Sequence, residues 1–381
     1  MKTNKFKIIV RGGYGRTNFG DDALMYVIHK YFLNDFTESE LAYNCKKVRY
    51  LKNYIGSYQI IPIENSINKK SEIVIYGGGT QFYSFKTKNK KPNKFIRLLS
   101  LISKPKKIVI KIRNKIFSNK FTNCIEQKKI AIGIGIGPFL DENMSKEIEI
   151  KELFQNMDFV AVRDKFSYNK CKEWGVKNLK LYSDLCYALE VSQNYKTVKY
   201  LSKILIIIRD WNLTNIDENY KNELIKVANT FKEKNIEVSF SIFAKNKDKN
   251  WLKFIRDKSQ PLLMWNPDKD NVESFIHQLD NYDLFITSRY HGAVFSTILG
   301  KPFIAIDIEQ KLKLFYELNK KGSELWTNPF NASELIEKIE KINNNYSTYV
   351  NNIKKVAAEQ KKLALDLRKK LNAYLNQKVA N

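Results

Sequence analysis

The segment FKIIVRGGYGRTNFGDDALMYVIHKYF, residues 6–32, predicts the fold class of this 381-residue chain. Its first five residues are mostly apolar and β-branched, which is typical of a buried strand. A glycine-rich loop follows, and the amphipathic run at 23–32 then predicts a helix. A strand, a tight loop and a helix in succession are the opening of a βαβ unit.

The loop in this segment has the glycine spacing of a nucleotide phosphate-binding loop, because four residues separate Gly15 from Gly20. Asp21 and Asp22, however, stand where such a loop has lysine and serine or threonine. A carboxylate repels a phosphate, so the aspartates need another role. One alternative is that one of them caps the following helix, which contributes about 1 kcal/mol.

The alternation of strands and helices continues along the chain. We expect further strands at 72–76, 129–137, 158–162, 201–210, 236–243, 282–291 and 301–308. We expect further helices before Gly175 and at 217–234, 271–280 and 349–375. This pattern predicts an α/β protein of two Rossmann-like, doubly wound domains.

The polar segment 192–200 resembles a linker, which divides the chain into domains at 1–195 and 196–381. The long terminal helix at 349–375 is expected to cross back to the first domain. In doubly wound sheets, ligands bind beyond the carboxyl ends of the strands. The loops after the predicted strands are therefore the candidate site.

Composition narrows the function classes. The formal net charge is +26, which indicates nucleic acid, anionic lipid or an acidic substrate as a partner. The four cysteines and three histidines are scattered, so no metal site is predicted and a reduced, intracellular chain is expected. The N-terminal apolar run is too short for a signal peptide, and no run is long enough to span a membrane, so we expect a cytoplasmic protein.

Glycines and arginines follow several of the predicted strands. Gly78 and Gly79, in YGGGTQF, let the backbone approach a ligand closely, although a tight turn without a ligand is an alternative. Arg163 and Arg209 end strands at matching positions of the two halves. A guanidinium suits phosphate or carboxylate, and the alternative is a structural ion pair.

The segment ITSRYHGAVFSTILGKPFIAIDIEQK, residues 286–311, carries the most informative candidates. Arg289 and His291 lie where a strand is predicted to end, and in an extended conformation both side chains point to the same side. Gly292 allows close approach, and the helix that begins there attracts anions. His291 is the candidate general acid, and Lys311 adds a cation to the site.

Six segments resemble the polysaccharide pyruvyl transferase family and occur in the family's order. They are NFGDDA, YGGGTQF, GIGIGP, VRDKFSY, SDLCYAL and SRYHGAVFSTILGKPFIAID, which together span about residues 10 to 313. The resemblance implies transfer of pyruvate from phosphoenolpyruvate onto two hydroxyls of a sugar, forming a ketal, in the synthesis of cell-surface polysaccharides. It also implies a fold similar to the B-type glycosyltransferases.

The resemblance assigns roles to particular residues. The family's Arg-x-His-Gly motif, implicated in phosphoenolpyruvate binding and catalysis, matches Arg289, His291 and Gly292. The first domain would handle the acceptor, which places Asn18 and Asp21 on saccharide hydroxyls, and the second would handle the donor. The cations assigned to phosphoenolpyruvate are Arg163, Arg209, Arg289 and Lys311. Phosphoenolpyruvate is then the donor substrate, and no cofactor or metal is expected.

The stretch at 86–120 contains thirteen lysines and arginines and no aspartate or glutamate, interleaved with apolar residues. Such a pattern suits an anionic membrane surface, and transferases of this family often act on lipid-linked sugars. Nucleic acid is disfavoured because no groove-binding motif accompanies the charge. A solvated insertion is the alternative.

Two other functions fit the sequence. A B-type glycosyltransferase that uses a nucleotide sugar would need the same pair of domains and the same basic loops. A non-catalytic partner in a polysaccharide assembly complex is the third hypothesis.

Overall fold

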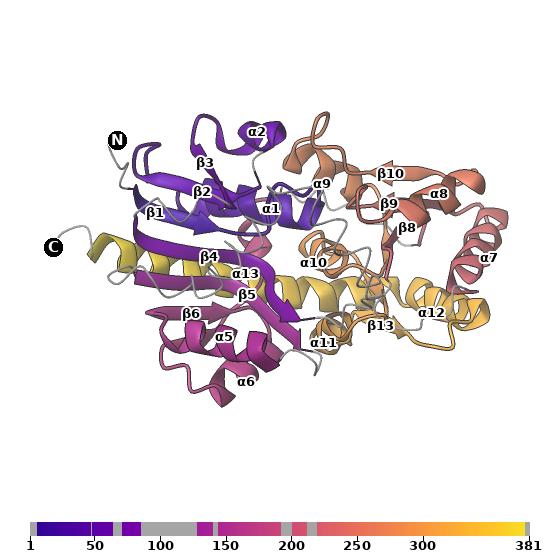
Figure 1. Cartoon of the computed structure of the whole chain (residues 1–381). Coiled ribbons are helices and arrows are strands. Elements are labelled where there is room, and N and C mark those ends of the chain that lie inside the picture. The colour runs from indigo at the N-terminus through magenta and orange to yellow at the C-terminus, as the bar shows by residue number, and fades with distance from the viewer. Residues whose placement is uncertain are drawn as a thin grey trace, which may run out of the picture.

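The structure is a computed structural model that describes residues 6–46, 48–63, 71–84, 128–139, 144–191, 200–211 and 219–377. The basic stretch at 86–120 and nearly all of the predicted linker lie outside these residues. The described residues form two parallel β-sheets that lie side by side, with helices packed around each (Figure 1).

The first sheet has seven strands in the order β3-β2-β1-β4-β5-β6-β7. Across the sheet these are Gln59–Pro62, Leu41–Cys45, Phe6–Arg11, Ser71–Ser84, Lys128–Phe139, Phe159–Val162 and Leu179–Leu181. Its helices are α1 (Phe19–Val27), the π-helix η1 (Ile28–Phe32), η2 (Arg49–Leu51), α2 (Lys52–Ile55), α5 (Met144–Gln155), α6 (Lys165–Glu173) and η5 (Leu185–Ala188).

The two-residue period of the strands explains why this sheet is covered on both faces. In β4, Ile73 and Ile75 belong to the large core that includes α1. The intervening Val74 and Tyr76 belong to a separate core that includes residues of α5 and α6. Both faces are apolar, so the strands appear in the sequence as continuous hydrophobic runs.

The second sheet has six strands in the order β10-β9-β8-β11-β12-β13. Across the sheet these are Leu262–Met264, Glu237–Ile242, Lys203–Ile208, Leu284–Thr287, Phe303–Ile306 and Ser323–Trp326. Its helices are α7 (Asn219–Glu233), α8 (Lys249–Asp257), α9 (Val272–Asp280), α10 (Tyr290–Ile298), α11 (Gln310–Asn319), α12 (Ala332–Asn344) and α13 (Tyr346–Gln377). The predicted α/β class with two doubly wound sheets is confirmed.

Several element boundaries differ from those predicted. β4 does not stop before its glycines but continues through them to Ser84, paired with β5, because Gly78 and Gly79 adopt φ of 61° and 78°. The short strands β2, β3, β7, β10 and β13 were not predicted. Each of these strands either has only three residues or contains a polar residue, whereas the equally short β6, β11 and β12 lie within longer apolar runs that the sequence does reveal.

Helix α1 begins at Phe19, earlier than the predicted start at residue 23, and its first turn enters the other half of the molecule. The Phe19 side chain is fully buried. Its ring lies 4.6–5.1 Å, centroid to centroid, from four rings of the second half: Phe243, Trp265, Phe275 and Phe295. The Phe19 amide also donates to the carbonyl of Phe243 at 2.9 Å. A helix of the first half is thereby fixed to the second sheet.

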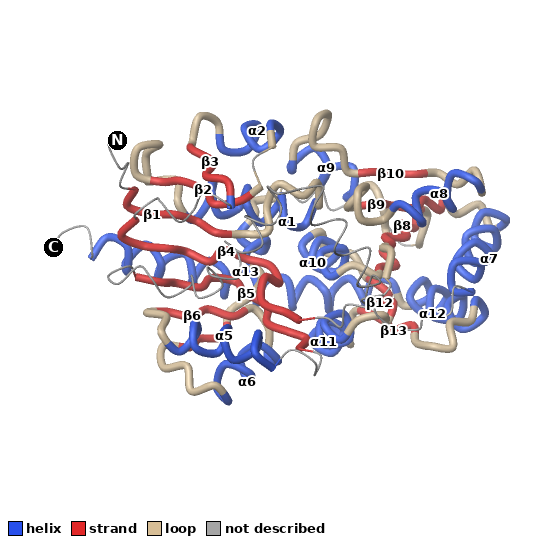
Figure 2. The backbone as a smooth tube through the Cα atoms, in the orientation of Figure 1, coloured by secondary structure: helices blue, strands red, loops and turns tan. Residues whose placement is uncertain are grey.

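The 32-residue helix α13 joins the two halves on another side. It runs from the second sheet to beneath the first, as the long yellow helix of Figure 1 and the blue tube of Figure 2 show. Ser183 of the first half donates to the Gln360 carbonyl at 2.8 Å.

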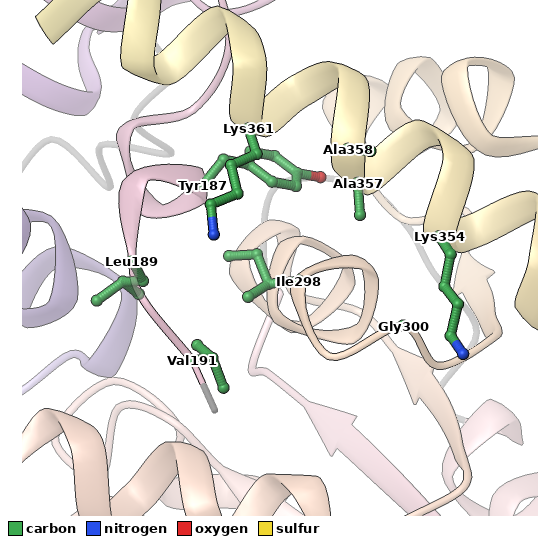
Figure 3. Close-up of a pocket in the computed structure, with 9 residues that line it drawn as sticks. All are labelled: Tyr187, Leu189, Val191, Ile298, Gly300, Lys354, Ala357, Ala358 and Lys361. Carbon is green, nitrogen blue, oxygen red and sulfur yellow. The ribbon is translucent and has the colours of Figure 1, made fainter. Parts of the chain in front are cut away.

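A cavity of about 330 Å³ lies under α13 where it passes α10 (Figure 3). Of the helices in the described part of the chain, none has both the length and the apolar character needed to cross a membrane.

The burial of Phe19 predicts a large stability effect. Phe19→Ala removes a ring enclosed by four others, so the free energy of unfolding should fall by about 3–5 kcal/mol in denaturant titrations. Tyr200→Ala is the control, because Tyr200 is 71% exposed and its loss should change stability by less than about 0.5 kcal/mol. Equal effects of the two substitutions would contradict the anchoring role of Phe19.

Candidate functional site

A cavity of about 720 Å³ lies between the carboxyl edges of the two sheets. In the first half its walls come from the carboxyl-terminal parts of β4 and β5 and from the loops after β1 and β6. In the second half they come from the segments after β8, β9, β11 and β12. Both sheets reverse their strand order at this edge, between β1 and β4 and between β8 and β11. Crevices at such switch points are where doubly wound folds bind ligands.

The first turn of α1 explains the two aspartates of the glycine loop. Asp21 lines the cavity and accepts from the Asn18 side-chain amide at 2.7 Å. Asp22 is buried and accepts from Trp265 Nε1 at 3.0 Å and from the Tyr50 hydroxyl at 2.9 Å. Neither caps the helix, because both lie inside its first turn and Asn18 holds the N-cap position. The capping alternative is therefore wrong.

Asp22 lies at the junction of the two halves, and the pKa of its carboxyl group is raised. Burial raises the pKa of Asp22 to about 7, although the hydrogen bonds from Trp265 and Tyr50 lower it. The carboxyl group of Asp22 therefore titrates near neutral pH, where an exposed aspartate is fully ionised.

Gly20 allows a close contact between α1 and His291. A Cβ at position 20 would lie 2.2 Å from His291 Nδ1, which is closer than any side chain tolerates. The imidazole therefore packs directly on the backbone of α1. Gly20, the second glycine of the Gly15–Gly20 spacing, therefore makes room for His291 and not for a phosphate.

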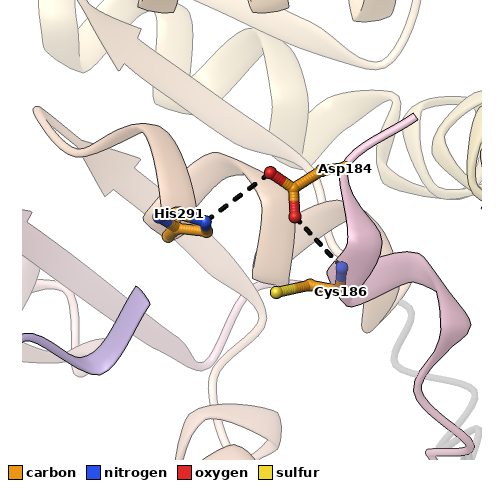
Figure 4. Close-up of side chains that lie close together, drawn as sticks. All are labelled: Asp184, Cys186 and His291. Carbon is orange, nitrogen blue, oxygen red and sulfur yellow. Dashed lines mark hydrogen bonds and ion pairs between the residues drawn. The ribbon is translucent and has the colours of Figure 1, made fainter. Parts of the chain in front are cut away.

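Asp184 connects the two walls of the cavity. It accepts from Arg163 at 2.8 Å, lies 3.6 Å from His291 Nε2, and its other oxygen accepts from the Cys186 amide at 3.0 Å (Figure 4). Burial alone would raise the pKa of Asp184, but His291 and Arg163 hold it well below its usual range. Asp184 is thus a permanent carboxylate behind the histidine.

Arg163 is held on three sides. Besides Asp184, its guanidinium donates to Thr80 Oγ1 at 3.0 Å and lies 4.0 Å from the centre of the Tyr290 ring. Such stacking and pairing leave the arginine rigid at the cavity wall.

Arg289 and His291 are not part of an extended strand. β11 ends at Thr287, Arg289 is the N-cap of α10, and His291 is already helical. The guanidinium of Arg289 is buried, pairs with Asp248 and donates to the Ile208 carbonyl at 3.3 Å. The two side chains therefore line one cavity while facing different carboxylates, which corrects the predicted same-side geometry.

Glu309 forms ion pairs with two of the predicted cations, Arg209 and Lys311. Arg209 donates to both of its oxygens at 3.1 Å, and Lys311 Nζ lies 3.3 Å away. Enclosure by the cavity walls lowers the pKa of Lys311 to about 8; Glu309 opposes this effect, and Arg209 and Arg163 add to it. Lys311 is therefore poised to gain full charge when an anion binds beside it.

Two further cations line the cavity and were missed in the sequence. Arg16 and Lys247 are exposed to solvent, and neither pairs with a carboxylate among the described residues. Packing around the Lys247 amine lowers its pKa; Asp21 opposes this, while Arg289, Arg16 and Arg209 add to it. A cluster of like charges of this kind binds an anion favourably.

The atoms of Asp184, Cys186 and His291 lie within 4.8 Å of one another, close enough for a metal ion (Figure 4). Asp184 already pairs with Arg163, and burial raises the pKa of the Cys186 thiol well above its usual range. A protonated thiol and a guanidinium-bound carboxylate are poor metal ligands. The cluster is better described as a histidine supported by a carboxylate.

The structure brings nine of the ten sequence-predicted site residues to this cavity. They are Asn18, Asp21, Gly78, Gly79, Arg163, Arg209, Arg289, His291 and Lys311. Gly292 is not among the lining residues; a Cβ there would lie 2.2 Å from Thr287 Oγ1, so its place is at the contact between α10 and β11.

The acidic partners Asp184, Asp248 and Glu309 were not predicted as site residues. Asp184 lies in SDLCYAL and Glu309 lies three residues beyond the end of β12, so carboxylates near strand ends were the available signal. Asp248 lies in a loop after β9, with nothing in its local sequence to connect it to Arg289.

Comparison with protein families gives one match to most of the chain. The sequence profile described as polysaccharide pyruvyl transferase matches residues 18–310. That range contains most of the cavity wall, from Asn18 of the α1 loop to Glu309 beyond β12, and leaves Arg16 and Lys311 just outside it. None of the curated proteins compared with the chain matches it.

Solved structures with the same architecture share little sequence with this chain. Staphylococcus aureus MnaA with UDP has a TM-score of 0.60 at 12% identity, covering 97% of each chain. Anabaena HepE with UDP and glucose has a TM-score of 0.55 at 10% identity, covering 97% of this chain and 99% of that one. Methanocaldococcus jannaschii UDP-GlcNAc 2-epimerase has a TM-score of 0.52 at 12% identity, covering 89% and 93%. These likenesses establish the B-type glycosyltransferase-like fold.

The contact between Gly20 and His291 can be tested by stability alone. Gly20→Ala should destabilise the protein by about 1–3 kcal/mol, because the new methyl meets the imidazole. In a His291→Ala background the same change should instead stabilise by about 0.5–1 kcal/mol, as alanine normally does in a helix. A double-mutant cycle in urea measures both, and the same effect in both backgrounds would exclude the contact.

The raised pKa of Asp22 predicts a pH dependence of stability. The unfolded chain releases the Asp22 proton near its ordinary pKa of 3.8, but the folded chain keeps it up to about pH 7. Between these values the folded state binds more protons, so this group makes the unfolding free energy fall as pH rises. Asp22→Asn removes the effect, so the variant should gain stability relative to wild type across this window. A difference that stays constant from about pH 4 to about pH 8 would show that Asp22 has an ordinary pKa.

Proposed function

Because the chain belongs to the polysaccharide pyruvyl transferase family, we propose that it transfers a pyruvyl group from phosphoenolpyruvate to two hydroxyls of a saccharide, forming a ketal. One observation carries the proposal: a histidine backed by a buried carboxylate opens into a cavity that also exposes unpaired cations. The reaction needs a proton donor next to an anion-binding site, because its donor substrate is an anion that must be protonated on carbon.

The donor would bind on the second half. Phosphoenolpyruvate carries a phosphate and a carboxylate on a three-carbon frame, so adjacent cations suit it. Lys247 of the second half and Arg16 on the first-half wall of the cavity have no carboxylate partner among the described residues, and Arg209 and Lys311 share a single glutamate. Arg289 and Arg163 are more fully neutralised by Asp248 and Asp184, so we assign them mainly to shaping the site.

The acceptor would bind on the first half. Asn18 and Asp21 line the cavity and offer amide and carboxylate groups to sugar hydroxyls. Gly78 and Gly79 of β4 lie beside the first turn of α1. A Cβ at Gly78 would lie 2.9 Å from Leu24 and one at Gly79 would lie 3.8 Å from Asp21 Oδ1, so the missing side chains let α1 pack close to β4 at the proposed acceptor wall.

The proposed reaction balances as follows. His291 protonates the methylene carbon of phosphoenolpyruvate, and the first sugar hydroxyl adds to the adjacent carbon, losing its proton. The bond from that carbon to the phosphate oxygen breaks and phosphate leaves. The second hydroxyl adds to the resulting oxocarbenium centre and loses its proton, which closes the ketal. One proton is consumed and two are released, of which one restores the histidine and the other protonates the departing phosphate.

Asp184 would orient the histidine in these steps. It lies beside Nε2 and remains ionised, so it favours a proton on that nitrogen. Nδ1 faces the first turn of α1, on the side of Asn18 and Asp21, and would exchange the proton with the substrates.

A glycosyltransferase that uses a nucleotide sugar is the second candidate function. Its support is the fold, since the similar structures of MnaA and HepE were determined with UDP. A cavity of about 720 Å³ is also large enough for a sugar nucleotide. The donor test below distinguishes the two functions.

We also propose that the protein works at the inner face of the cytoplasmic membrane, on a lipid-linked acceptor. The support is the charge of the stretch at 86–120, which has thirteen cations and no acid. A peripheral position would bring the cavity to acceptors anchored in the bilayer.

Donor choice is the decisive experiment. Phosphoenolpyruvate should raise the melting temperature by mass action, and uridine or guanosine sugar nucleotides should not. Incubation with phosphoenolpyruvate and candidate saccharides should then yield a product heavier by one pyruvyl ketal, detected by mass spectrometry. Stabilisation by a nucleotide sugar alone would favour the glycosyltransferase.

His291→Gln tests the proton donor. Glutamine keeps hydrogen bonding but cannot act as an acid near neutral pH, so turnover should fall by about 10²–10⁴-fold while phosphoenolpyruvate affinity changes little. Lys247→Gln is the matched variant, because losing an unpaired cation should weaken donor binding first. Near-normal turnover of the His291 variant would leave the histidine a packing residue of the Gly20 contact.

A further inference from the structure

The cavity under α13 is separate from the cleft between the sheets. It has a volume of about 330 Å³, and none of its lining residues lines the larger cavity. One wall follows η5, a second is the carboxyl end of α10, and α13 forms the third (Figure 3). A volume of this size suits a small ligand.

All three walls of this pocket contribute apolar side chains. Leu189 and Val191 extend from the η5 side, Ile298 from α10, and Ala357 from α13. These side chains offer van der Waals contact to an aliphatic chain and no hydrogen bonds.

The third wall adds positive charge. Lys354 and Lys361 both project from α13, and Figure 3 shows the Lys361 amine directed between Leu189 and Ile298. No carboxylate belongs to the described lining, and no ion pair joins Lys361 to another described residue. A cation beside apolar side chains suits a ligand that has an anionic group at one end and an aliphatic chain at the other.

A buried hydroxyl provides an independent sign of a ligand. Tyr187 lines the pocket with its side chain almost wholly buried. The Thr297 side chain lies near its hydroxyl, but no described residue meets that hydroxyl with the distance and angle of a hydrogen bond. Buried hydroxyls are nearly always paired in folded proteins, so an unpaired one at a cavity wall calls for a partner.

We propose that this pocket binds a small anionic amphiphile, with a phosphate or carboxylate headgroup at Lys361 and a short aliphatic chain along Leu189, Val191 and Ile298. The headgroup oxygen supplies the acceptor that the Tyr187 hydroxyl lacks. The site is distinct from that of the proposed donor and acceptor, and does not depend on the transfer reaction.

The position of the pocket gives its ligand contact with both halves. η5 begins directly after Asp184, and α10 carries His291 near its amino end and Ile298 at its carboxyl end. A bound amphiphile would therefore touch the far ends of the two elements that hold the Asp184–His291 pair. Binding should stabilise the junction and raise the melting temperature.

Isothermal titration calorimetry of the full chain with octyl phosphate tests the proposal. Inorganic phosphate and octanol supply the headgroup and the chain alone, and both should bind more weakly than octyl phosphate. Lys361→Gln should weaken octyl phosphate binding about five- to tenfold through loss of a charge-assisted contact. Lys362→Gln, the exposed neighbour that does not line the pocket, should bind as wild type.

Two more variants separate this pocket from the cleft. Ala357→Leu fills the pocket and should reduce octyl phosphate binding further, whereas Arg209→Gln in the cleft should leave it unchanged. Binding that is insensitive to Lys361→Gln and Ala357→Leu, or lost with Arg209→Gln, would overturn the proposal. Equal binding of inorganic and octyl phosphate would also overturn it, since that shows an anion site only.

A competition arm identifies the source of the ligand. Displacement of octyl phosphate from wild type by phosphatidylglycerol vesicles points to a membrane lipid. Displacement is the readout and vesicle binding is not, because the stretch at 86–120 is itself proposed to bind anionic vesicles. Displacement by free octanoate or alkyl phosphates without any effect of vesicles points to a soluble metabolite.

Discussion

The insertion of the first turn of α1 into the second half is the constraint on which the cleft depends. Phe19 fills a pocket of four aromatic rings, and Asp22 beside it accepts from Trp265, so the turn cannot move without unpacking a core. The same turn presents Asp21 to the cavity and supports His291 on Gly20. One packed contact therefore sets the distance between the two walls of the cavity.

Charge pairing organises the rest of the site. The arginines nearest the strand ends are held by carboxylates behind them, Arg163 by Asp184 and Arg289 by Asp248. These pairs lie in the protein interior, where an unpaired charge would be very costly. The cations left to a substrate lie further out, at Arg16, Lys247 and the shared pair on Glu309. The buried ion pairs shape the site, and the outer cations make its surface electropositive.

The two halves repeat one architecture. Both sheets have the Rossmann strand order around a switch point, and the two switch points face each other across the cavity. The fold itself is shared with structures at 10–12% identity, including MnaA and HepE, and so does not decide the chemistry. The residues after the strands decide it, and these match the polysaccharide pyruvyl transferase family.

The sequence by itself determined the fold class and most of the cavity wall. Apolar runs separated by amphipathic helices require parallel sheets, and parallel sheets place the residues after their strands at one edge, so Arg163, Arg209 and Arg289 could be assigned to a common site. Only the tertiary structure decided which carboxylate each cation faces, why Gly20 has no side chain, and which aspartate is buried. Those facts depend on contacts between residues as far apart as Asp22 and Trp265, and local periodicity carries no information about such pairs.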